Sequence, residues 1–566
     1  MKPALPIVCA LALAVATALA PRAAQSQDGE SPPGAAVQHS SSCARCHSNA
    51  DGAEALRDAA GRGIAPHDLW SGTMMANASL DPLWRAAVSI EVAATPAARE
   101  AIETKCVSCH APMGHLAAFD GERYGEFATP MDVLHDDGPV GELARDGVSC
   151  SVCHGIAPDG LGTAASFSGG FELDPWNRLF GPHTDPRPQP MTRATGFTPT
   201  HGEHVIESAL CATCHTLETH TLDEQGAPTG HVLLEQGAYL EWRTSIFDTE
   251  SPRDGHRGRA CQECHVPRYD EDGREIETGI ARRPDGKDFP FVEPRRPFGR
   301  HAFVGGNTLV LGMLADHAEE LGVTASPEAL ARTRAATLEQ LRTRTASVGV
   351  DGVELDGDRL RFEVTVVNRT GHKLPTGHPT RRVFLRATVR DADGAVLFSS
   401  GATDGTGRVV DTAGRPLASE SAGGPVQPHR DTVTASDQLV EYRSVMADAE
   451  GAPTHVLMRG ARYLVDTRLL PRGFDPEHPD APRVAPVGTE GDDDFTGGRD
   501  RVRFEITVPS GTRPASVEVE VCYQTLSARW ADEMAQYDTE EVRRFLAMYA
   551  TADREPVVLA SARAEL

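Results

Sequence analysis

The sequence predicts a multidomain protein with a loop-rich, mainly helical first part, a helical connector and a C-terminal antiparallel β-sandwich. Three observations support this fold class. Five short cysteine motifs lie between residues 43 and 265, in a region rich in glycine, proline and histidine. Two helical patterns follow near residues 307 and 327. From about residue 348, hydrophobic and polar residues alternate, as they do in strands with one buried face.

Each cysteine motif has the form Cys-x-x-Cys-His. The five copies are Cys43–His47, Cys106–His110, Cys150–His154, Cys211–His215 and Cys261–His265. Two thiols three residues apart lie on one side of a short helical turn, where both can bond to the vinyl groups of one haem. The next histidine is close enough to ligate the iron, so the pattern is the attachment signature of c-type haem. It predicts five covalent haem c groups.

The motifs assign a role to each of their cysteines and histidines. Covalent attachment is expected at Cys43, Cys46, Cys106, Cys109, Cys150, Cys153, Cys211, Cys214, Cys261 and Cys264. The proximal iron ligands are expected to be His47, His110, His154, His215 and His265. Zinc ribbons need paired CxxC units, and five units do not pair off. A redox disulfide does not need histidine in the next position.

The N-terminus has the pattern of an export signal. Lys2 precedes an apolar run from Ala4 to Ala20, and cleavage is expected near Ala24-Gln25-Ser26. We therefore expect residues 1–26 to be a cleaved signal peptide and the mature protein to be periplasmic or otherwise extracytoplasmic. An uncleaved anchor is the alternative, but the run is short and rich in alanine.

The chain is strongly acidic. Its formal net charge is −26, and loss of Lys2 and Arg22 with the leader makes it −28. A polyanion repels nucleic acid and anionic lipid, so we expect no nucleic acid and at most a peripheral contact with a membrane. A cationic redox protein is an expected partner, although acidic charge is also a common means of keeping a protein in solution.

Residues 27–300 form the predicted pentahaem domain. Haem groups supply much of an apolar core, so we expect the polypeptide to wrap them as loops and short helices. The clearer helices are Pro82–Ala94, with Asp81 as N-cap, and the approach to Cys211 through His204–Leu210.

Residues 301–347 form the predicted helical connector. One helix is expected over Asn307–Leu321, and a second runs from Pro327 to about Thr345 with Ser326 as N-cap.

Residues 348–566 form the predicted β-sandwich with a terminal helix. Leu360, Phe362, Val364 and Val366 alternate with polar residues, and residues 502–508 and 517–523 repeat this pattern. A turn at 391–394 indicates a hairpin between 383–390 and 395–399. Residues 400–500 are rich in loops. A helix is expected over Glu540–Tyr549 and a closing strand over Pro556–Ala560.

Two features of this part lie outside the haem motifs. Cys522 falls in an expected strand and is most simply a structural thiol. The run Asp492-Asp493-Asp494 resembles a calcium ligand cluster only weakly, and a solvated acidic loop is the simpler interpretation.

The function depends on the sixth ligand of each iron. A bis-histidine haem suits electron transfer, whereas an open distal position can bind and convert a small molecule. The candidate distal ligands are His67, His115, His135, His204, His301 and His372. Glycines beside His301 and His372 allow close approach to a flat ring. The alternative for each candidate is an ordinary surface or hydrogen-bonded histidine. Met74 and Met75 are alternative axial ligands, for which core packing is the simpler role.

Several segments resemble an exported multihaem c-type cytochrome family related to cytochrome c-554, with its cytochrome c-552/4 domain. They are Trp70–Met75, Asp81–Trp84, Cys106–Met113, Gly147–His154, Leu210–Leu217, Tyr239–Trp242, His301–Asn307 and Gly371–Arg382. The resemblance implies bis-histidine haems packed edge to edge and periplasmic electron transfer. The chain lacks the Cys-x-x-Cys-Lys motif that nitrite-reducing multihaem enzymes often carry.

Motifs, leader and resemblance together favour an exported pentahaem cytochrome that transfers electrons between redox partners through closely packed haems. We assign no catalytic residue and expect an electron-transfer protein more than a substrate-converting enzyme. The alternative is a multihaem oxidoreductase with one open-coordinate haem that reduces or oxidises a small nitrogen or sulfur compound.

Overall fold

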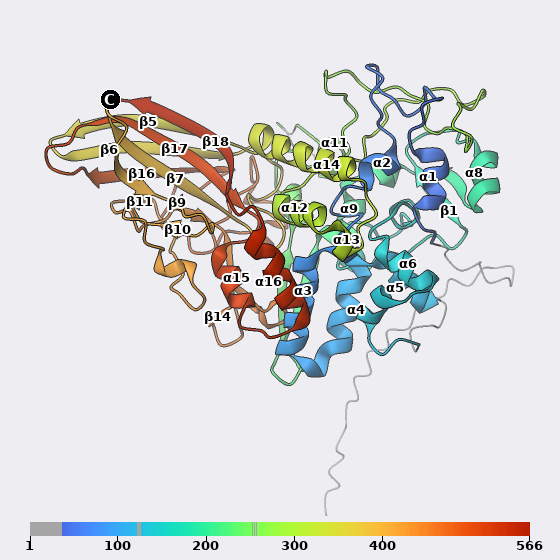
Figure 1. The fold of residues 1–566 in the computed structure, drawn as a ribbon, viewed down its shortest axis with the longest axis horizontal. Coiled ribbons are helices and arrows are strands. Elements are labelled where there is room, and N and C mark those ends of the chain that lie inside the picture. Colours follow the sequence, from blue (N-terminus) through green and yellow to red (C-terminus); the bar gives the residue numbers. More distant parts are fainter. Residues whose placement is uncertain (1–36, 121–125, 252, 254, 256) are drawn as a thin grey trace, which may run out of the picture.

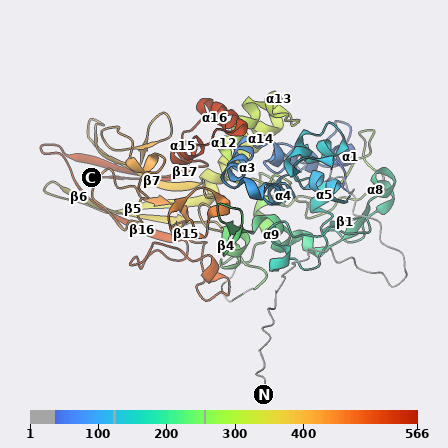
Figure 2. The same ribbon diagram turned by 90° about the horizontal axis from the view of Figure 1, so that it is seen from below.

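The computed structural model describes residues 37–120, 126–251, 253, 255 and 257–566. The predicted signal peptide, residues 1–26, lies outside the described residues. One half of the described chain is helical and rich in loops, and the other is built from β-sheets (Figure 1). A view from below shows the same two halves side by side (Figure 2). None of the helices described has both the length and the apolar composition that crossing a bilayer requires.

The helical half consists of short helices joined by long connections. The helices are α1 (Ser41–His47), α2 (Pro66–Trp70), α3 (Pro82–Ala94), α4 (Arg99–His110), α5 (Pro112–Asp120), α6 (Pro139–Arg145), α7 (Cys150–Cys153), α8 (Pro188–Thr195), α9 (Ser208–His215), α10 (Ala238–Arg243) and α11 (Cys261–His265). Strand β1 (Arg178–Gly181) pairs with β2 (Thr198–His201), and β3 (Leu217–Leu222) pairs with β4 (Pro228–Gln236).

The two helices predicted in this half have different outcomes. The helix over Pro82–Ala94 is confirmed, and Asp81 caps it by accepting hydrogen bonds from the N–H groups of Leu83 at 2.8 Å and Trp84 at 3.1 Å. The continuous helix over His204–Leu210 is wrong. A 3-10 turn spans Glu203–Ile206, and Glu207 is extended (φ −97°, ψ 145°) before α9 begins. His204 therefore does not lie on α9.

The connector contains α12 (Thr308–Asp316), α13 (Ala318–Leu321) and α14 (Pro327–Gln340). The single helix expected over 307–321 is interrupted at His317, whose φ of −122° is not helical. The second predicted helix is confirmed as α14. Ser326 is its N-cap, because Ser326 Oγ accepts a hydrogen bond from the N–H of Ala329 at 3.2 Å. A π-helical turn, Leu341–Thr345, continues α14 to the expected end.

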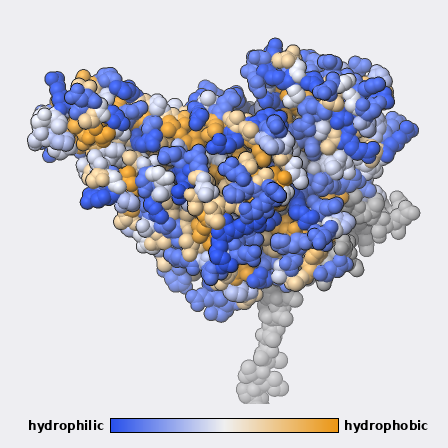
Figure 3. Space-filling model, in the orientation of Figure 1, coloured by the Kyte–Doolittle hydropathy of each residue, from blue (hydrophilic) through white to orange (hydrophobic). Residues whose placement is uncertain are grey.

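Two helices near the C-terminus return to the first half. Helices α15 (Ala528–Met534) and α16 (Glu540–Thr551) share one hydrophobic cluster with α3, α12 and α14. Phe545 of α16 is completely buried there, in the same cluster as Ile90 of α3 and Val310 of α12. The two halves are thus joined by a common core. The face shown in Figure 3 is mostly hydrophilic, and hydrophobic residues gather toward the junction of the halves.

The β half contains two larger sheets. The four-stranded sheet has the order β11-β16-β6-β5, and the five-stranded sheet has the order β12-β7-β17-β18 with β8 beside β7. The strands are β5 (Ala346–Asp356), β6 (Arg359–Asn368), β7 (Arg382–Asp391), β8 (Val396–Ser400), β11 (Thr432–Val433), β12 (Glu441–Tyr442), β16 (Arg499–Thr507), β17 (Pro514–Gln524) and β18 (Val557–Glu565). Neighbours pair antiparallel except β11 with β16.

The hairpin predicted at residues 391–394 is confirmed as β7 and β8, and the predicted closing strand is part of β18. Short strands occupy the loop-rich stretch. They are β9 (Ala402–Thr403), β10 (Val409–Val410), β13 (Ser444–Ala447), β14 (Pro453–Thr454) and β15 (Arg462–Asp466).

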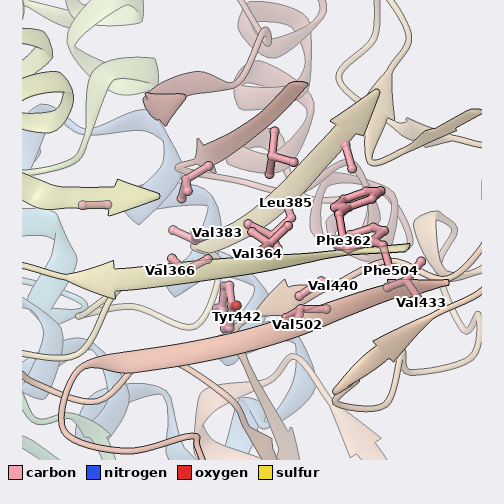
Figure 4. Packing of buried hydrophobic residues seen from close by; sticks show 14 of the residues in the cluster. Phe362, Val364, Val366, Val383, Leu385, Val433, Val440, Tyr442, Val502 and Phe504 are labelled. Atoms are coloured by element: carbon pink, nitrogen blue, oxygen red, sulfur yellow. The ribbon is translucent and has the colours of Figure 1, made fainter. Parts of the chain in front are cut away.

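The two larger sheets enclose a hydrophobic core (Figure 4). Phe362 of β6 stacks on Phe504 of β16 with ring centroids 4.7 Å apart, and both are almost fully buried. Each side chain of this kind contributes about 1.5–3 kcal/mol by leaving water. The alternating residues of the sequence therefore supply the inner faces of the sheets.

Candidate haem-binding site

All five Cys-x-x-Cys-His motifs lie on helical turns. Motifs one, two and four end the helices α1, α4 and α9, and the fifth forms α11. The third forms α7, with His154 directly after it. Nine of the motif cysteines are half-buried and Cys264 is exposed, whereas Cys522 is buried. The motif thiols therefore border space that another group can reach, and Cys522 does not.

The five motifs lie close to one another in space. The thiols of Cys43 and Cys150 shift each other's pKa, which places the first motif beside the third. The thiols of Cys109 and Cys214 shift each other's pKa in the same way, as do those of Cys211 and Cys261. The thiol of Cys153 also raises the pKa of Cys211 and Cys214 by its charge, so the third motif adjoins the fourth. The motifs thus form one connected array.

Hydrogen bonds set the tautomer of four of the proximal histidines. Each Nδ1 lies against a backbone carbonyl, and a carbonyl can only accept, so Nδ1 carries the proton. The partners are Ile280 for His47 (3.0 Å), Ala78 for His110 (3.4 Å), Phe180 for His154 (2.6 Å) and Val304 for His265 (2.8 Å). Nε2 is then left with its lone pair, which is the arrangement that metal-binding histidines adopt.

Burial keeps these imidazoles neutral. Loss of hydration lowers the pKa of His47, His110 and His265 from 6.5 to about 4. Burial also lowers the pKa of the half-buried His154. At neutral pH each ring is therefore uncharged, which is the form that ligates a metal.

His301 lies opposite a proximal histidine. Its ring centroid is 6.2 Å from that of His154, with an angle of 29° between the ring planes. A metal binds an imidazole nitrogen at about 2.0 Å, so two imidazoles on opposite sides of one ion have centroids roughly 6 Å apart. His301 Nδ1 donates to the carbonyl of Gly299 at 3.0 Å, which leaves its Nε2 for the metal. The pair therefore has the spacing of two axial ligands.

His372 lies near the fifth motif. Its charge lowers the pKa of His265, which shows that the two rings are neighbours. His372 Nδ1 donates to the carbonyl of Lys373 at 3.0 Å, so Nε2 is again the unprotonated nitrogen. The Lys373 ammonium is fully buried and bonds to Asp466 at 2.6 Å, which anchors the backbone beside His372.

His378 is a further candidate that the sequence analysis did not identify. Burial lowers the pKa of His378 from 6.5 to about 3, and the charges of Arg381 and His110 also lower it. His378 is therefore a neighbour of His110. The N–H of Thr380 donates to His378 Nδ1 at 3.3 Å, and the Thr380 hydroxyl lies 3.2 Å from the same nitrogen. To ligate through Nε2, His378 would have to give up the first bond and donate Nδ1–H to the hydroxyl. A sequence signal was present, because Thr-Gly-His occurs at 370–372 and again at 376–378.

The other four candidates have different surroundings. His67 lies close enough to His47 that its charge lowers the pKa of His47. The Nδ1 of His67 is 3.2 Å from Ser48 Oγ. His115 lies half-buried on α5, and burial lowers its pKa. His135 is exposed at the end of a 3-10 segment, Pro130–His135. His204 is buried, and its Nε2 donates to the carbonyl of Ile156 at 3.0 Å. Its Nε2 is thus protonated, and we leave it out of the proposed ligands.

These residues fit c-type haem. Each motif offers a pair of thiols and an imidazole. In four of them, at His47, His110, His154 and His265, a backbone carbonyl sets the tautomer and leaves Nε2 free. The histidine pair at 6.2 Å adds a second axial position. The fold therefore assembles, from segments far apart in sequence, the groups that haem attachment and ligation require.

Comparison with known proteins gives one structural likeness. No model of a known protein family matches the chain, and no curated protein matches it in sequence. The crystal structure of a penta-haem cytochrome c552 from Thermochromatium tepidum is similar to it, with a TM-score of 0.50 and 18% sequence identity. The match covers 94% of this chain and 99% of the cytochrome. Over nearly its whole length, the chain therefore shares the fold of a multihaem cytochrome.

Proposed function

We propose that the protein is an exported pentahaem c-type cytochrome that carries electrons between redox partners. The observation that carries this proposal is the connected array of five Cys-x-x-Cys-His motifs. Electron transfer through a protein requires redox centres that lie close together, and each motif is the attachment point of one centre. The likeness to a penta-haem cytochrome supports the same conclusion.

The ten motif cysteines would hold five haem c groups, with the motif histidines as proximal ligands. Haem iron supplies a one-electron couple when it is bound. The chain's own residues orient the ligands, because backbone carbonyls hold Nδ1–H and direct Nε2 inward. We assign His301 as distal partner of His154, His372 as that of His265 and His378 as that of His110. His67 is the candidate for His47.

We infer that the two larger sheets form the predicted β-sandwich domain, after a haem domain and a helical connector. His372 and His378 lie on the connection between β6 and β7, so the β half would supply ligands to the haem half. Its role would then be to complete the haem sites.

Export and partner are part of the same proposal. The leader pattern of residues 1–26 and the chemistry of haem c attachment support a periplasmic location. The formal charge of −28 after cleavage, from −26 with Lys2 and Arg22 removed, favours a cationic redox protein as partner. It disfavours nucleic acid and anything beyond peripheral contact with an anionic membrane.

Mass spectrometry and EPR of the purified protein test the proposal together. The protein should be produced in a host that matures c-type cytochromes, and its intact mass should include five covalent haems. Its EPR spectrum should show low-spin iron at the bis-histidine centres. Fewer than five haem increments would contradict the stoichiometry. A high-spin centre that binds nitrite or hydroxylamine would instead favour the oxidoreductase.

A further inference from the structure

The β half contains a carboxylate in a position where the sheet otherwise places hydrophobic side chains. Asp500 lies on β16 and faces inward, as Val502, Phe504 and Ile506 do farther along the strand. Its side chain is completely buried, with 0% relative exposure. An ionised carboxylate at such a site is costly unless hydrogen bonds or a cation compensate for the lost hydration.

Only one oxygen of Asp500 is compensated within the described chain. Oδ2 accepts a hydrogen bond from the hydroxyl of Tyr442 at 2.7 Å. Tyr442 comes from β12 of the facing sheet and lies within the core between the sheets (Figure 4). Oδ1 is buried and has no hydrogen-bond partner among the described residues. This unpartnered oxygen indicates that another group completes the site.

Two further ligating side chains converge on Asp500. His429 Nε2 lies 2.6 Å from Asp492 Oδ2, and these side chains are only 7% and 5% exposed. One ligand atom each from His429, Asp492 and Asp500 lies within 4.8 Å of the other two. Ligand atoms around an ion that binds them at about 2.1 Å are separated by up to about 4.2 Å. In a tetrahedral site such atoms are about 3.4 Å apart, so the His429 and Asp492 atoms, at 2.6 Å, would move apart slightly and Asp500 would move inward to share one ion.

The loop around Asp492 is held in place by its own hydrogen bonds. Asp492 Oδ1 accepts from the N–H groups of Asp494 and Phe495, both at 3.1 Å. Asp494 Oδ1 accepts from the N–H of Arg501 at 3.0 Å. Asp492, Asp494 and Asp431 form a second group with ligand atoms within 4.8 Å of one another. Several carboxylates thus surround the His429 imidazole. Burial raises the pKa of Asp500, and the negative charges of Asp492 and Asp494 raise it further.

We propose that His429, Asp492 and Asp500 bind one divalent transition-metal ion, with Zn²⁺ as the best match. Imidazole nitrogen with carboxylate oxygen is a donor set that zinc accepts, whereas calcium takes 6–8 oxygen ligands. The ion would replace the proton that His429 and Asp492 share and would bond to the unpartnered Oδ1 of Asp500. It would fasten the loop before β16, and the segment before β11, to the inner face of the sheet.

The competing explanation is a buried ion pair between protonated His429 and Asp492. It explains the 2.6 Å contact but leaves Asp500 Oδ1 without a partner. Metal binding and an ion pair make opposite predictions for a titration, because only the metal site takes up zinc.

Calorimetric titration of the holoprotein with ZnCl₂, after dialysis against a chelator, tests the site. We expect one tight zinc site that Asp500→Asn weakens at least ~10-fold and His429→Gln weakens similarly. Asp493→Asn is the matched control, since Asp493 is exposed in the same loop and outside both groups of ligands. It should bind zinc like the wild type. The haem spectrum should be unchanged in all three variants, which checks that they fold.

Three outcomes would overturn the proposal. One is the absence of a tight zinc site in the wild type. Another is a tight site that survives both Asp500→Asn and His429→Gln, which would place it elsewhere, for example on surface histidines. The third is a calcium site that His429→Gln does not affect, which would assign the ion to Asp431, Asp492 and Asp494 instead. None of these results bears on the five haems, so they leave the proposed electron-transfer function in place.

Discussion

At the scale of single residues, the proton on one nitrogen decides whether a histidine can bind iron. His301 is half-buried and His204 is buried. His301 donates Nδ1–H to Gly299 and keeps Nε2 free, whereas His204 donates from Nε2 to Ile156. Because a carbonyl only accepts, the choice of ring nitrogen is settled by the backbone around it. The same reasoning assigns His372 to the candidate ligands.

Replacement of His301 tests this assignment. We expect His301→Ala to leave the iron at the third motif with one axial histidine, so one of the five haems should change from low-spin to high-spin in the EPR spectrum. His135→Ala is the control, because His135 is exposed. Its spectrum should match the wild type. An unchanged low-spin signal in His301→Ala would remove His301 from the ligand set.

Asp466 makes a prediction about acid stability. Buried beside Arg468 and Lys373, it has its pKa lowered from 3.8 to about 2. A depressed carboxyl pKa contributes stability that is complete above about pH 4 and is lost as the pH falls toward 2. The contribution is about 2 kcal/mol. Asp466→Asn should therefore lower the free energy of unfolding at pH 7, and the difference from the wild type should shrink between pH 4 and pH 2.

Denaturant unfolding followed by the far-ultraviolet circular dichroism signal measures this difference. Asp393→Asn serves as the control, since Asp393 lies exposed in the turn between β7 and β8. A constant difference between Asp466→Asn and the wild type from pH 7 to pH 2 would contradict the ion-pair explanation.

At the scale of secondary-structure elements, the two halves are tied together through helix α3. Glu91, near its C-terminal end, accepts hydrogen bonds from the N–H groups of Leu457 at 2.7 Å and Met458 at 3.0 Å. These two residues begin a 3-10 turn of the β half, Leu457–Arg459. Helix α16 packs on the same helix, and Phe545 belongs to the hydrophobic cluster that they share. Helix α3 thus contacts the β half by both polar and apolar groups.

Glu91→Gln should loosen this junction. The amide can accept from only one of the two N–H groups, and an unpaired buried donor costs about 1–3 kcal/mol. Thermal unfolding should shift to lower temperature while the haem count stays the same. Glu100→Gln is the control, because Glu100 is exposed on the neighbouring helix α4. Equal melting temperatures for both variants would show that the contact with Leu457 and Met458 does not stabilise the junction.

At the scale of the whole molecule, the third motif links the first motif to the rest of the array. Its thiols adjoin those of the first and the fourth motif, so it connects segments more than a hundred residues apart. The clusters of hydrophobic residues in the helical half are small compared with the core between the sheets. Bound haem would therefore supply a large part of the stability of this half, as metal does in small metal-dependent domains.

Loss of the third attachment site should unfold the helical half. Cys150→Ala with Cys153→Ala is expected to give a product that limited proteolysis cuts within residues 37–300, while the β half resists. Cys522→Ala is the matched control, since Cys522 is buried in β17 and outside the motifs. It should keep all five haems and stay resistant. A folded, protease-resistant double variant would show that this half is stable without the third haem.

The sequence alone predicted the groups whose chemistry is local. A Cys-x-x-Cys-His motif places its thiols and imidazole within one helical turn, so all five attachment sites could be recognised without a fold. The cap of α3 at Asp81 and the alternation of β6 are also local, and the structure contains both. The break at Glu207 was not predictable in this way, because it depends on contacts with distant segments such as Cys261, whose N–H bonds to Ser208.

Only the tertiary structure decided which histidines face the motifs. His154 and His301 are 147 positions apart in the sequence, and nothing in their spacing indicates that their rings lie 6.2 Å apart. His429 and Asp500 converge in the same way, although the sequence showed only the acidic run at 492–494. Covalent attachment needs neighbours along the chain, whereas axial ligation and ion binding need neighbours in space. The sequence therefore determined where haem attachment is expected, and the packing of the two halves determined which histidines lie close to those motifs.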